Sequence, residues 1–414
     1  MKYTADEVMQ YAAEEDVKFV RLAFCDIRGR QKNIAILPDE LGRAFRYGIA
    51  IDASAIAGFG GEVHSDLFLH PDTSTLTFLP WLSEQGKVIR MFCHITYPDG
   101  TPFEADTRSI LAKAVDCAHE QGVSFAFGSE MEFYLFKLDE NGEPTKLPYD
   151  NASYMDIAPE DKGENVRREV CFTLEQMGIK PESAHHEEGP GQNEIDFRYS
   201  DPVTSADNAV TFRGVVNTVA ARNGLCADFS PKPLENRSGN GMHINISVRS
   251  EDGGDALPQV IAGILAHISD MTVFLNTTED SYLRFGSNKA PRYISWSSEN
   301  RSQLIRIPAA EGEYRRAELR SPDPACNPYL AFALILAAAM EGITEVTPPQ
   351  APMAVTEYLP GNLEEAIALA ENSQFVREVI PESTLKKYLD EKRKTAARFD
   401  ADPKAVFQQH LRTI

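Results

Sequence analysis

Hydrophobic positions in the middle of the chain repeat with two different periods, one typical of helices and one typical of strands. Apolar residues spaced along one helical face predict helices over residues 106–121, 163–178, 204–223, 257–275 and 326–343. Alternating polar and apolar residues predict strands over residues 123–137, 193–199, 242–248, 302–307 and 315–320. Strands that alternate with helices in this way indicate an α/β or α+β domain.

The N-terminal part of the chain has a different pattern, dominated by short alternating segments. A capping-box sequence predicts a short helix over residues 4–15, and turn residues between alternating segments predict a hairpin over 17–37. Further strand-like segments lie at 75–80 and 87–96, and a turn-rich segment follows at 98–103. We therefore expect a small β-rich domain that ends near residue 100.

The length of the chain agrees with this division. A chain of 414 residues is long enough for two or three domains, and we assign residues 1–100 to the first domain and 101–414 to the second. A charged helical pattern continues over 382–399.

The longest apolar run, 329–340, is too short to span a bilayer, and the N-terminus has no apolar signal core. We therefore expect a cytoplasmic protein with no membrane partner.

The negative net charge of the chain disfavours polyanionic partners. The formal net charge is −21, which repels a phosphate backbone, so nucleic acid is not expected as a partner. An anionic substrate such as ATP then requires local arginine, lysine or metal ions. The six cysteines are far apart in apolar contexts, which predicts free buried thiols rather than disulfides.

One predicted strand, GSEMEFYLF at residues 128–136, carries carboxylates on one face. Its two-residue period puts Glu130, Glu132 and Tyr134 on that face and apolar side chains on the other. Carboxylates held side by side repel each other, at a cost of order 1 kcal/mol, unless water or a cation lies between them. Taken alone, the segment is explained as well by a solvated surface face.

A second set of carboxylates lies within residues 185–199. Glu194, Asp196 and Arg198 share one strand face, and Glu187 lies just before a Gly-Pro-Gly turn. A loop that brings one more carboxylate beside this strand would create a site of hard oxygen ligands for a divalent cation. A plain surface loop is the alternative interpretation.

A histidine and a glycine distinguish the segment 238–248. His243, Asn245 and Ser247 share one strand face, and Gly239 allows the backbone to approach a ligand closely. A single histidine on such a strand is also typical of a hydrogen-bonded structural residue, so this segment alone does not indicate a function.

Five arginines are concentrated between residues 300 and 324. Arg316 and Arg320 flank Glu318 on one strand face, and Arg301 and Arg306 precede them. Guanidinium groups bind phosphate and carboxylate groups through paired hydrogen bonds, so such a cluster in an acidic protein suits an anionic substrate. An exposed face of salt bridges is the alternative.

Together these segments predict a single site in which one sheet gathers carboxylates, a histidine and arginines. Such a site would hold divalent cations through the carboxylates and phosphate groups through the cations and arginines. The sequence contains neither GxxxxGK[ST] nor GxGxxG, which excludes a P-loop or a Rossmann dinucleotide site.

These segments, in this order, resemble the glutamine synthetase family over residues 17 to 345. The most specific motifs are GSEMEFYLF, GPGQNEIDF, KPLENRSGNGMH, NRSQLIRIP and RRAELRSPDPACNPYLAFA. The resemblance implies an α+β protein with a small N-terminal β-grasp-like domain and a large C-terminal catalytic domain, built round a curved antiparallel sheet flanked by helices. It also implies a ring-shaped homo-oligomer, typically a dodecamer, with sites between neighbouring subunits.

The resemblance further implies ATP as a substrate and two or more Mg²⁺ or Mn²⁺ ions in each site. One ion would be held by Glu132, Glu187 and Glu194. The second would be held by Glu130, His243 and Glu318. Glu132 and His243 would also face the substrate.

The remaining site residues carry substrate roles in the family. Three arginines would bind the ATP phosphates and stabilise the transferred phosphoryl group: Arg301, Arg306 and Arg316. Ser247 would lie near the adenine, and Gly239 against the amino group of the amino-acid substrate. Arg284 and Arg320 would bind that substrate's carboxylates. Asp52, contributed by a neighbouring subunit, would complete the ammonium pocket.

The substrate end of the motif set departs from the family pattern. Lys289 stands where the family has a glutamate on a closing loop, in a loop one residue shorter than usual. A lysine there would repel ammonium, which the usual glutamate attracts. Ser238 replaces an asparagine, and Ala53 and Ala55 follow Asp52 where a glycine and a serine are usual. The tyrosine loop that some bacterial members modify with AMP is not recognisable.

We therefore expect an ATP-dependent glutamate–ammonia ligase that acts through a γ-glutamyl phosphate intermediate. A γ-glutamyl–amine ligase that uses a small amine is one alternative. A catalytically silent paralogue, acting as a sensor or assembly partner, is another, although it would have no chemical reason to keep the metal ligands and arginines. A guanidino kinase would share the arginine-rich phosphate site but leaves the GPGQNEIDF and NGMHIN motifs unexplained.

Overall fold

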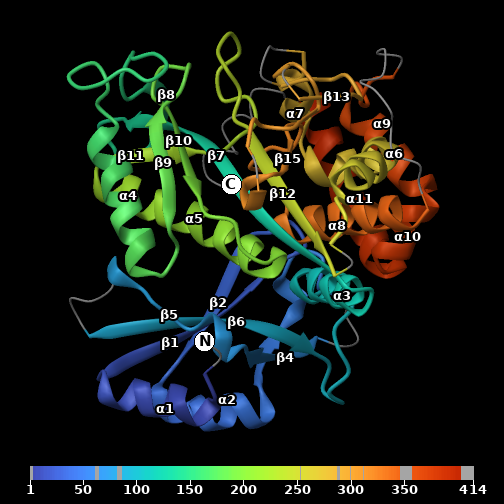
Figure 1. Ribbon diagram of the computed structural model, residues 1–414. Coiled ribbons are helices and arrows are strands. Elements are labelled where there is room, and N and C mark those ends of the chain that lie inside the picture. Colours follow the sequence, from blue (N-terminus) through green and yellow to red (C-terminus); the bar gives the residue numbers. More distant parts are fainter. Residues whose placement is uncertain are drawn as a thin grey trace.

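The computed structural model describes residues 3–60, 65–81, 86–251, 253–286, 290–298, 300–310, 312–345 and 357–401. Two sheets divide these residues, one N-terminal and one C-terminal, and each has its own cluster of buried hydrophobic side chains. The smaller sheet lies below the larger one in Figure 1.

The N-terminal sheet has six strands in the order β2-β1-β6-β4-β3, with β5 paired to β6. Its strands are β1 (Val17–Cys25), β2 (Gln31–Ile36), β3 (Ile49–Asp52), β4 (Asp66–Pro71), β5 (Thr77–Phe78) and β6 (Lys87–Thr96). The pair β1–β6 is parallel and the other pairs are antiparallel. Two helices, α1 (Ala5–Glu14) and α2 (Leu41–Tyr47), cover one side of this sheet (Figure 1).

The C-terminal sheet has nine strands in the order β13-β14-β15-β12-β7-β10-β9, with β8 and β11 paired to β7. Its strands are β7 (Val123–Leu138), β8 (Pro144–Pro148), β9 (Pro181–His186), β10 (Gln192–Phe197), β11 (Leu225–Asp228), β12 (Met242–Ser250), β13 (Trp296–Ser297), β14 (Ile305–Arg306) and β15 (Ala317–Leu319). The long strand β7 is the centre of the sheet, because it pairs with four other strands.

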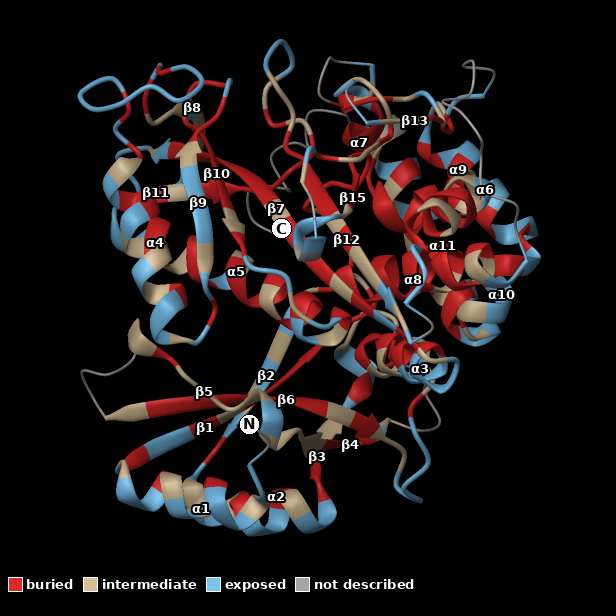
Figure 2. Ribbon diagram, in the orientation of Figure 1, coloured by how far each residue is buried: buried red, intermediate tan, exposed pale blue. Residues whose placement is uncertain are grey.

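Helices pack around this sheet and supply most of its core. They are α3 (Thr107–Glu120), α4 (Glu164–Gln176), α5 (Pro202–Arg222), α6 (Leu257–Leu275), α7 (Glu279–Arg284), α8 (Pro328–Thr344), α9 (Leu363–Asn372), α10 (Gln374–Val379) and α11 (Glu382–Ala401). The helix α8 is buried over most of its length (Figure 2), which explains its nearly uninterrupted apolar sequence. Within the described residues, α6 alone is long and apolar enough to cross a bilayer. However, 61% of its apolar stretch is buried inside the protein, as in a core helix.

The expected α+β class is confirmed, and the differences from the expected elements are local. The strand expected over 302–307 is only two residues long, Ile305–Arg306, because turns occupy the residues before it. The short strands β9 and β11 and the six-residue helix α7 had no clear periodic pattern and were not expected. Short segments of this kind are specified by their partners in the fold rather than by their own sequence.

Candidate active site

The register of three neighbouring strands brings acidic side chains from distant parts of the chain to one face of the C-terminal sheet. Glu132 of β7 lies opposite Glu194 of β10, and Glu130 lies opposite Asp196. On the other side of β7, His243 of β12 lies opposite Glu130. The expected faces of these strands are thus brought together in one place.

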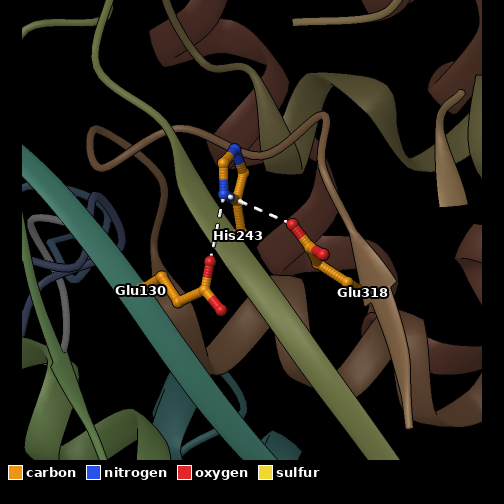
Figure 3. Close-up of side chains that lie close together, drawn as sticks. All are labelled: Glu130, His243 and Glu318. Atoms are coloured by element: carbon orange, nitrogen blue, oxygen red, sulfur yellow. Dashed lines mark hydrogen bonds and ion pairs between the residues drawn. The ribbon is translucent and has the colours of Figure 1, made fainter. Parts of the chain in front are cut away.

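Glu130, His243 and Glu318 form one compact group, contributed by β7, β12 and β15. A ligand atom of each residue lies within 4.8 Å of the others. The imidazole Nδ1 of His243 is 3.3 Å from Oε2 of Glu130 and 3.6 Å from Oε1 of Glu318 (Figure 3). Two carboxylates that converge on one ring nitrogen are a ligand set suited to a divalent cation.

A second group lies on the neighbouring strands and combines His185, Glu187 and Glu194 within the same 4.8 Å limit. Glu130, Glu194 and Asp196 form a third, overlapping group. Within the described residues, no such group includes Glu132, although the family resemblance implies that it holds an ion with Glu187 and Glu194. The two histidine-containing groups are nevertheless continuous, because Glu130 and Glu194 join them through the third.

Glu132 is instead held by hydrogen bonds from the protein. Its Oε2 accepts from the side-chain amide of Gln192 at 3.1 Å and from the backbone N–H of Gly241 at 3.0 Å. The same amide of Gln192 also donates to the carbonyl of Gly239. Gln192 is fully buried and links the carboxylates to the glycine-rich segment. Sequence reasoning missed its role, although it lies inside the GPGQNEIDF motif.

The pKa values of these carboxylates reflect how close together they are buried. Burial raises the pKa of Glu194 well above its usual value, and the charge of Glu132 adds to this shift. Burial, followed by the charge of Glu130, raises the pKa of Asp196 to about 6. Burial acts on Glu130 in the same direction, but hydrogen bonds and charge from His243 outweigh it and lower the pKa to about 2. A cation among these groups would relieve the repulsion.

Arginines close the opposite side of the acidic groups. Arg306 donates from Nε to Oε2 of Glu318 at 2.6 Å, and Arg320 is paired with Oε1 of the same carboxylate. Arg316 donates from Nε to Oδ1 of Asn245 at 2.7 Å, and the amide of Asn245 donates to Glu130. These three arginines therefore contact the carboxylate groups directly or through one amide.

A cavity of about 320 Å³ opens beside this arrangement. Glu130, Asn245, Ser247 and Arg316 are among its lining residues. Ser247 of β12 thus lines the same cavity as Glu130 and Arg316. The cavity places a free volume between carboxylates and a guanidinium, which is the environment that a phosphate chain with bound cations requires.

Arg284 and Gly239 lie together at the other end of the arrangement. Arg284 is buried and donates to the carbonyls of Ser321 at 2.7 Å and Arg320 at 3.2 Å. A Cβ atom at Gly239 would lie 2.4 Å from the carbonyl oxygen of Pro231 and 2.9 Å from Cγ of Arg284. Only glycine fits at this position without displacing the arginine.

The remaining expected residues lie elsewhere or outside the described chain. Asp52 ends β3 in the N-terminal sheet, is exposed, and accepts from the backbone N–H of Ser54 at 2.9 Å. Arg301 is exposed in the turn before β14. Ser238 donates its hydroxyl to Glu188 at 3.2 Å. Lys289 lies outside the described residues.

Family models and curated relatives match almost the whole chain. A family model described as the glutamine synthetase catalytic domain matches residues 104–409, and one described as the glutamine synthetase β-grasp domain matches residues 16–98. A protein named glutamine synthetase from Clostridium saccharobutylicum is 41% identical over 94% of both chains. One of the same name from Methanosarcina mazei is 42% identical over 93% of this chain and 92% of its own.

Solved structures match over nearly the whole chain. A structure titled as a GmaS/ADP complex has a TM-score of 0.87 at 26% identity and covers 97% of both chains. Plasmodium falciparum glutamine synthetase has a TM-score of 0.87 at 21% identity, with 97% of this chain and 98% of that chain covered, and so shows the likeness of fold.

Proposed function

Because the chain belongs to the glutamine synthetase family, we propose that it is an ATP-dependent glutamate–ammonia ligase that acts through γ-glutamyl phosphate. One observation carries this proposal: the carboxylates and the histidine of β7, β10, β12 and β15 meet on one sheet face, directly against arginines. The family uses ATP and divalent cations, and this face has groups suited to both.

The chemistry explains why such a face is needed. A carboxylate does not react with ammonia near neutral pH, because an oxide ion is too poor a leaving group. Transfer of the γ-phosphoryl group of ATP to the γ-carboxylate of glutamate breaks the bond to ADP and forms an acyl phosphate. Ammonia then attacks the acyl carbon, phosphate leaves, and a proton is lost from nitrogen. Glutamine, ADP and phosphate are the products.

The acidic groups fit divalent cations. Three ligand atoms lie within 4.8 Å of one another in each group, and buried like charges need a counter-ion. We propose that Glu130, His243 and Glu318 would hold one ion, and that Glu187 and Glu194, with Glu132 close by, would hold the other. Such ions, when bound, neutralise charge on the phosphate oxygens and align them for transfer.

The arginines have complementary roles in the proposal. Arg306 and Arg316 would bind phosphate oxygens together with the exposed Arg301, while Ser247 would lie near the adenine. Arg284 and Arg320 would orient the carboxylates of glutamate. Arg284 lies beside Gly239, Arg320 is paired with Glu318, and Arg284 donates to the carbonyl of Arg320. Arginine is suited to these tasks, since its fork of donors pairs with two oxygens at once.

Ammonia is favoured over a larger amine as the nitrogen donor. The relatives named glutamine synthetase are 41–43% identical to this chain over 82–94% of its length. Lys289 puts a positive charge where the family has a glutamate, which opposes ammonium binding, so the preference for ammonia rests on these relatives.

We also propose that the active form is a ring-shaped homo-oligomer, a dodecamer, in which Asp52 of one subunit completes the site of its neighbour. Asp52 is exposed at the end of β3, in the sheet that does not carry the acidic groups. A role in catalysis therefore requires a second copy of the chain. The proposed domain boundary near residue 100 is supported by the two family matches, which end at 98 and begin at 104.

The proposal is tested by measuring ADP release from the purified protein with glutamate, ATP and Mg²⁺ and a panel of nitrogen donors. We expect ammonium to give the highest kcat/KM, above methylamine, ethanolamine and a diamine. Faster release with one of the amines would identify an amine ligase. Tight ATP binding without turnover for any donor would identify a silent paralogue, and either result would contradict the proposal.

A further inference from the structure

A second cavity, of about 610 Å³, lies between the two domains and away from the acidic sheet face. The turn between β1 and β2, the helix α5 and the helix α11 all contribute to its lining. The turn contacts the catalytic domain directly, because Nη2 of Arg213 on α5 donates to the carbonyl of Gly29 at 3.0 Å. A Cβ atom at Gly29 would meet Cα of Asn327 at 2.7 Å, so the turn approaches this domain as closely as a glycine allows. In Figure 1 the strand β2 rises from the lower sheet toward α5.

The lining of this interdomain cavity is strongly basic. It includes nine arginine and lysine side chains but a single acid, Glu391. That acid is already paired, with Arg28 and with Lys394 at 3.0 Å. The whole protein, by contrast, has a net charge of −21. A concentration of positive charge in an acidic protein is costly unless an anion is bound, because like charges repel more strongly where water is excluded.

Lys392 of α11 is the most deeply buried lysine of this cavity, and it has no carboxylate partner in the described chain. Its side chain is buried, with 7% of its surface exposed, yet it lines the cavity. Within the described part of the chain, its ammonium group has no hydrogen bond or ion pair, and Nζ lies over the ring of Tyr388, 4.9 Å from the centroid. Burial, followed by the charge of Arg28, lowers the pKa of Lys392 to about 8. Buried lysines are normally paired.

Two other cations of the lining, Arg213 and Arg90, donate to neutral oxygens, whereas Lys32 lies 3.7 Å from Oδ2 of Asp26. Arg213 donates to three backbone carbonyls, those of Gly29, Pro324 and Cys326. Arg90 donates to the hydroxyl of Thr211 at 2.7 Å, while its Nε is buried without a partner within the described residues. Neutral oxygens satisfy donors but leave the positive charge in place.

We propose that the interdomain cavity binds a small multivalent anion through a diphosphate group. Six arginines and three lysines line a space large enough for such a ligand. Arginine forks match the several equivalent oxygens of phosphate groups. None of the lining residues belongs to the acidic groups or to the arginines of the sheet face, so this site is separate from the one proposed for catalysis.

Binding there would link the two domains. The ligand would contact the β1–β2 turn of one domain and α5 and α11 of the other, and it would neutralise the repulsion that now opposes their packing. An anion that binds the folded protein alone raises its stability by mass action. The site therefore offers a way for an anionic metabolite to act on the enzyme without entering the active site.

The proposal is tested by calorimetric titration of the full chain with pyrophosphate in metal-free buffer, together with the shift in melting temperature. The informative variants are Lys392→Met and Arg30→Gln, since both side chains line the cavity. Lys386→Gln is the matched control, because it removes an exposed charge from the same helix outside the cavity. We expect about tenfold weaker binding for each cavity variant, equivalent to about 1.4 kcal/mol, and no change for the control.

Two further arms identify the source of the signal. Pyrophosphate can also meet the arginines of the sheet face, so Arg316→Gln is titrated in parallel and should retain the interdomain binding. ADP in place of pyrophosphate distinguishes a nucleotide from a free diphosphate, and either ligand supports the proposal only if Lys392→Met and Arg30→Gln weaken its binding while Arg316→Gln does not. Equal affinity in the wild type and in the Lys392→Met/Arg30→Gln double variant would overturn it. Tighter binding of citrate than of pyrophosphate, or an equal melting shift with sodium chloride of the same ionic strength, would also overturn it.

Discussion

Replacing Glu318 by glutamine tests whether the carboxylate groups of the sheet are built for cations. Glu318 is 1% exposed and pairs with both Arg306 and Arg320. Glutamine keeps the shape but removes the charge, so two guanidiniums lose their counter-ion. Breaking a buried pair in this way costs about 3–5 kcal/mol. The Arg306 side chain is 18% exposed and partly solvated, so we expect a loss near the lower end, about 3 kcal/mol.

The same change should weaken metal binding by a different mechanism. In the wild type, Oε1 of Glu318 is 3.6 Å from Nδ1 of His243, so one ion can contact both residues and Glu130. Loss of one full negative charge next to a divalent ion should raise the dissociation constant for Mn²⁺ by about 100-fold, or about 3 kcal/mol. Free Mn²⁺, counted by electron paramagnetic resonance during a titration, measures this directly.

Asp207→Asn is the matched control. Asp207 is also a buried carboxylate paired with an arginine, Arg108, whose Nη2 is 3.0 Å from Oδ2, and it accepts the hydroxyl of Tyr329. It lies outside the acidic groups of the sheet, so this variant should lose similar stability but bind Mn²⁺ normally. Wild-type Mn²⁺ affinity in Glu318→Gln would refute the reasoning. An equal loss of Mn²⁺ binding in both variants would show that destabilisation alone explains it.

Three other predictions concern the glycine beside Arg284, the buried lysine of the interdomain cavity and the proposed contact between subunits. Gly239→Ala places a Cβ 2.9 Å from Cγ of Arg284, so the KM for glutamate should rise at least about tenfold while the KM for ATP changes less, as steady-state kinetics would show. Lys392 has a pKa lowered from 10.5 to about 8, so the unfolded chain holds this proton more tightly than the folded chain. The stability of the wild type relative to Lys392→Met should therefore rise by about 3 kcal/mol between about pH 8 and 10.5, as denaturant unfolding of both proteins would show. If neighbouring subunits share a site, mixing inactive Asp52→Ala and Glu130→Ala chains after dissociation should restore part of the activity, whereas mixtures that stay inactive would contradict a shared site.

The sequence predicts the faces of the strands well, because each face follows from a local two-residue period. Glu130 and Glu132 were expected on one face of β7, and the pairing with β10 does put them opposite other acids. The family motifs also predict the order of these strands along the chain. The pairing of β7 with β12, more than a hundred residues later, follows only from the fold.

Other features depend on contacts that no local pattern contains. Glu132 is held by Gln192 and Gly241 rather than lying in a compact ligand group, because the buried amide of Gln192 reaches it across the strand pair. His185 joins a ligand group from a strand with no periodic signal. The interdomain cavity collects its cations from the β1–β2 turn, α5 and α11, which are far apart in sequence, so its charge could not be predicted before the fold was known.

The most direct test of the central claim follows one oxygen atom. The protein is incubated with ATP, ammonium and glutamate labelled with oxygen-18 in the γ-carboxylate, and the released phosphate is analysed by mass spectrometry. Activation of the carboxylate by phosphoryl transfer predicts that one labelled oxygen moves from glutamate to phosphate for each glutamine formed. Glutamine formed with unlabelled phosphate would contradict an acyl phosphate intermediate, and with it the account of this site.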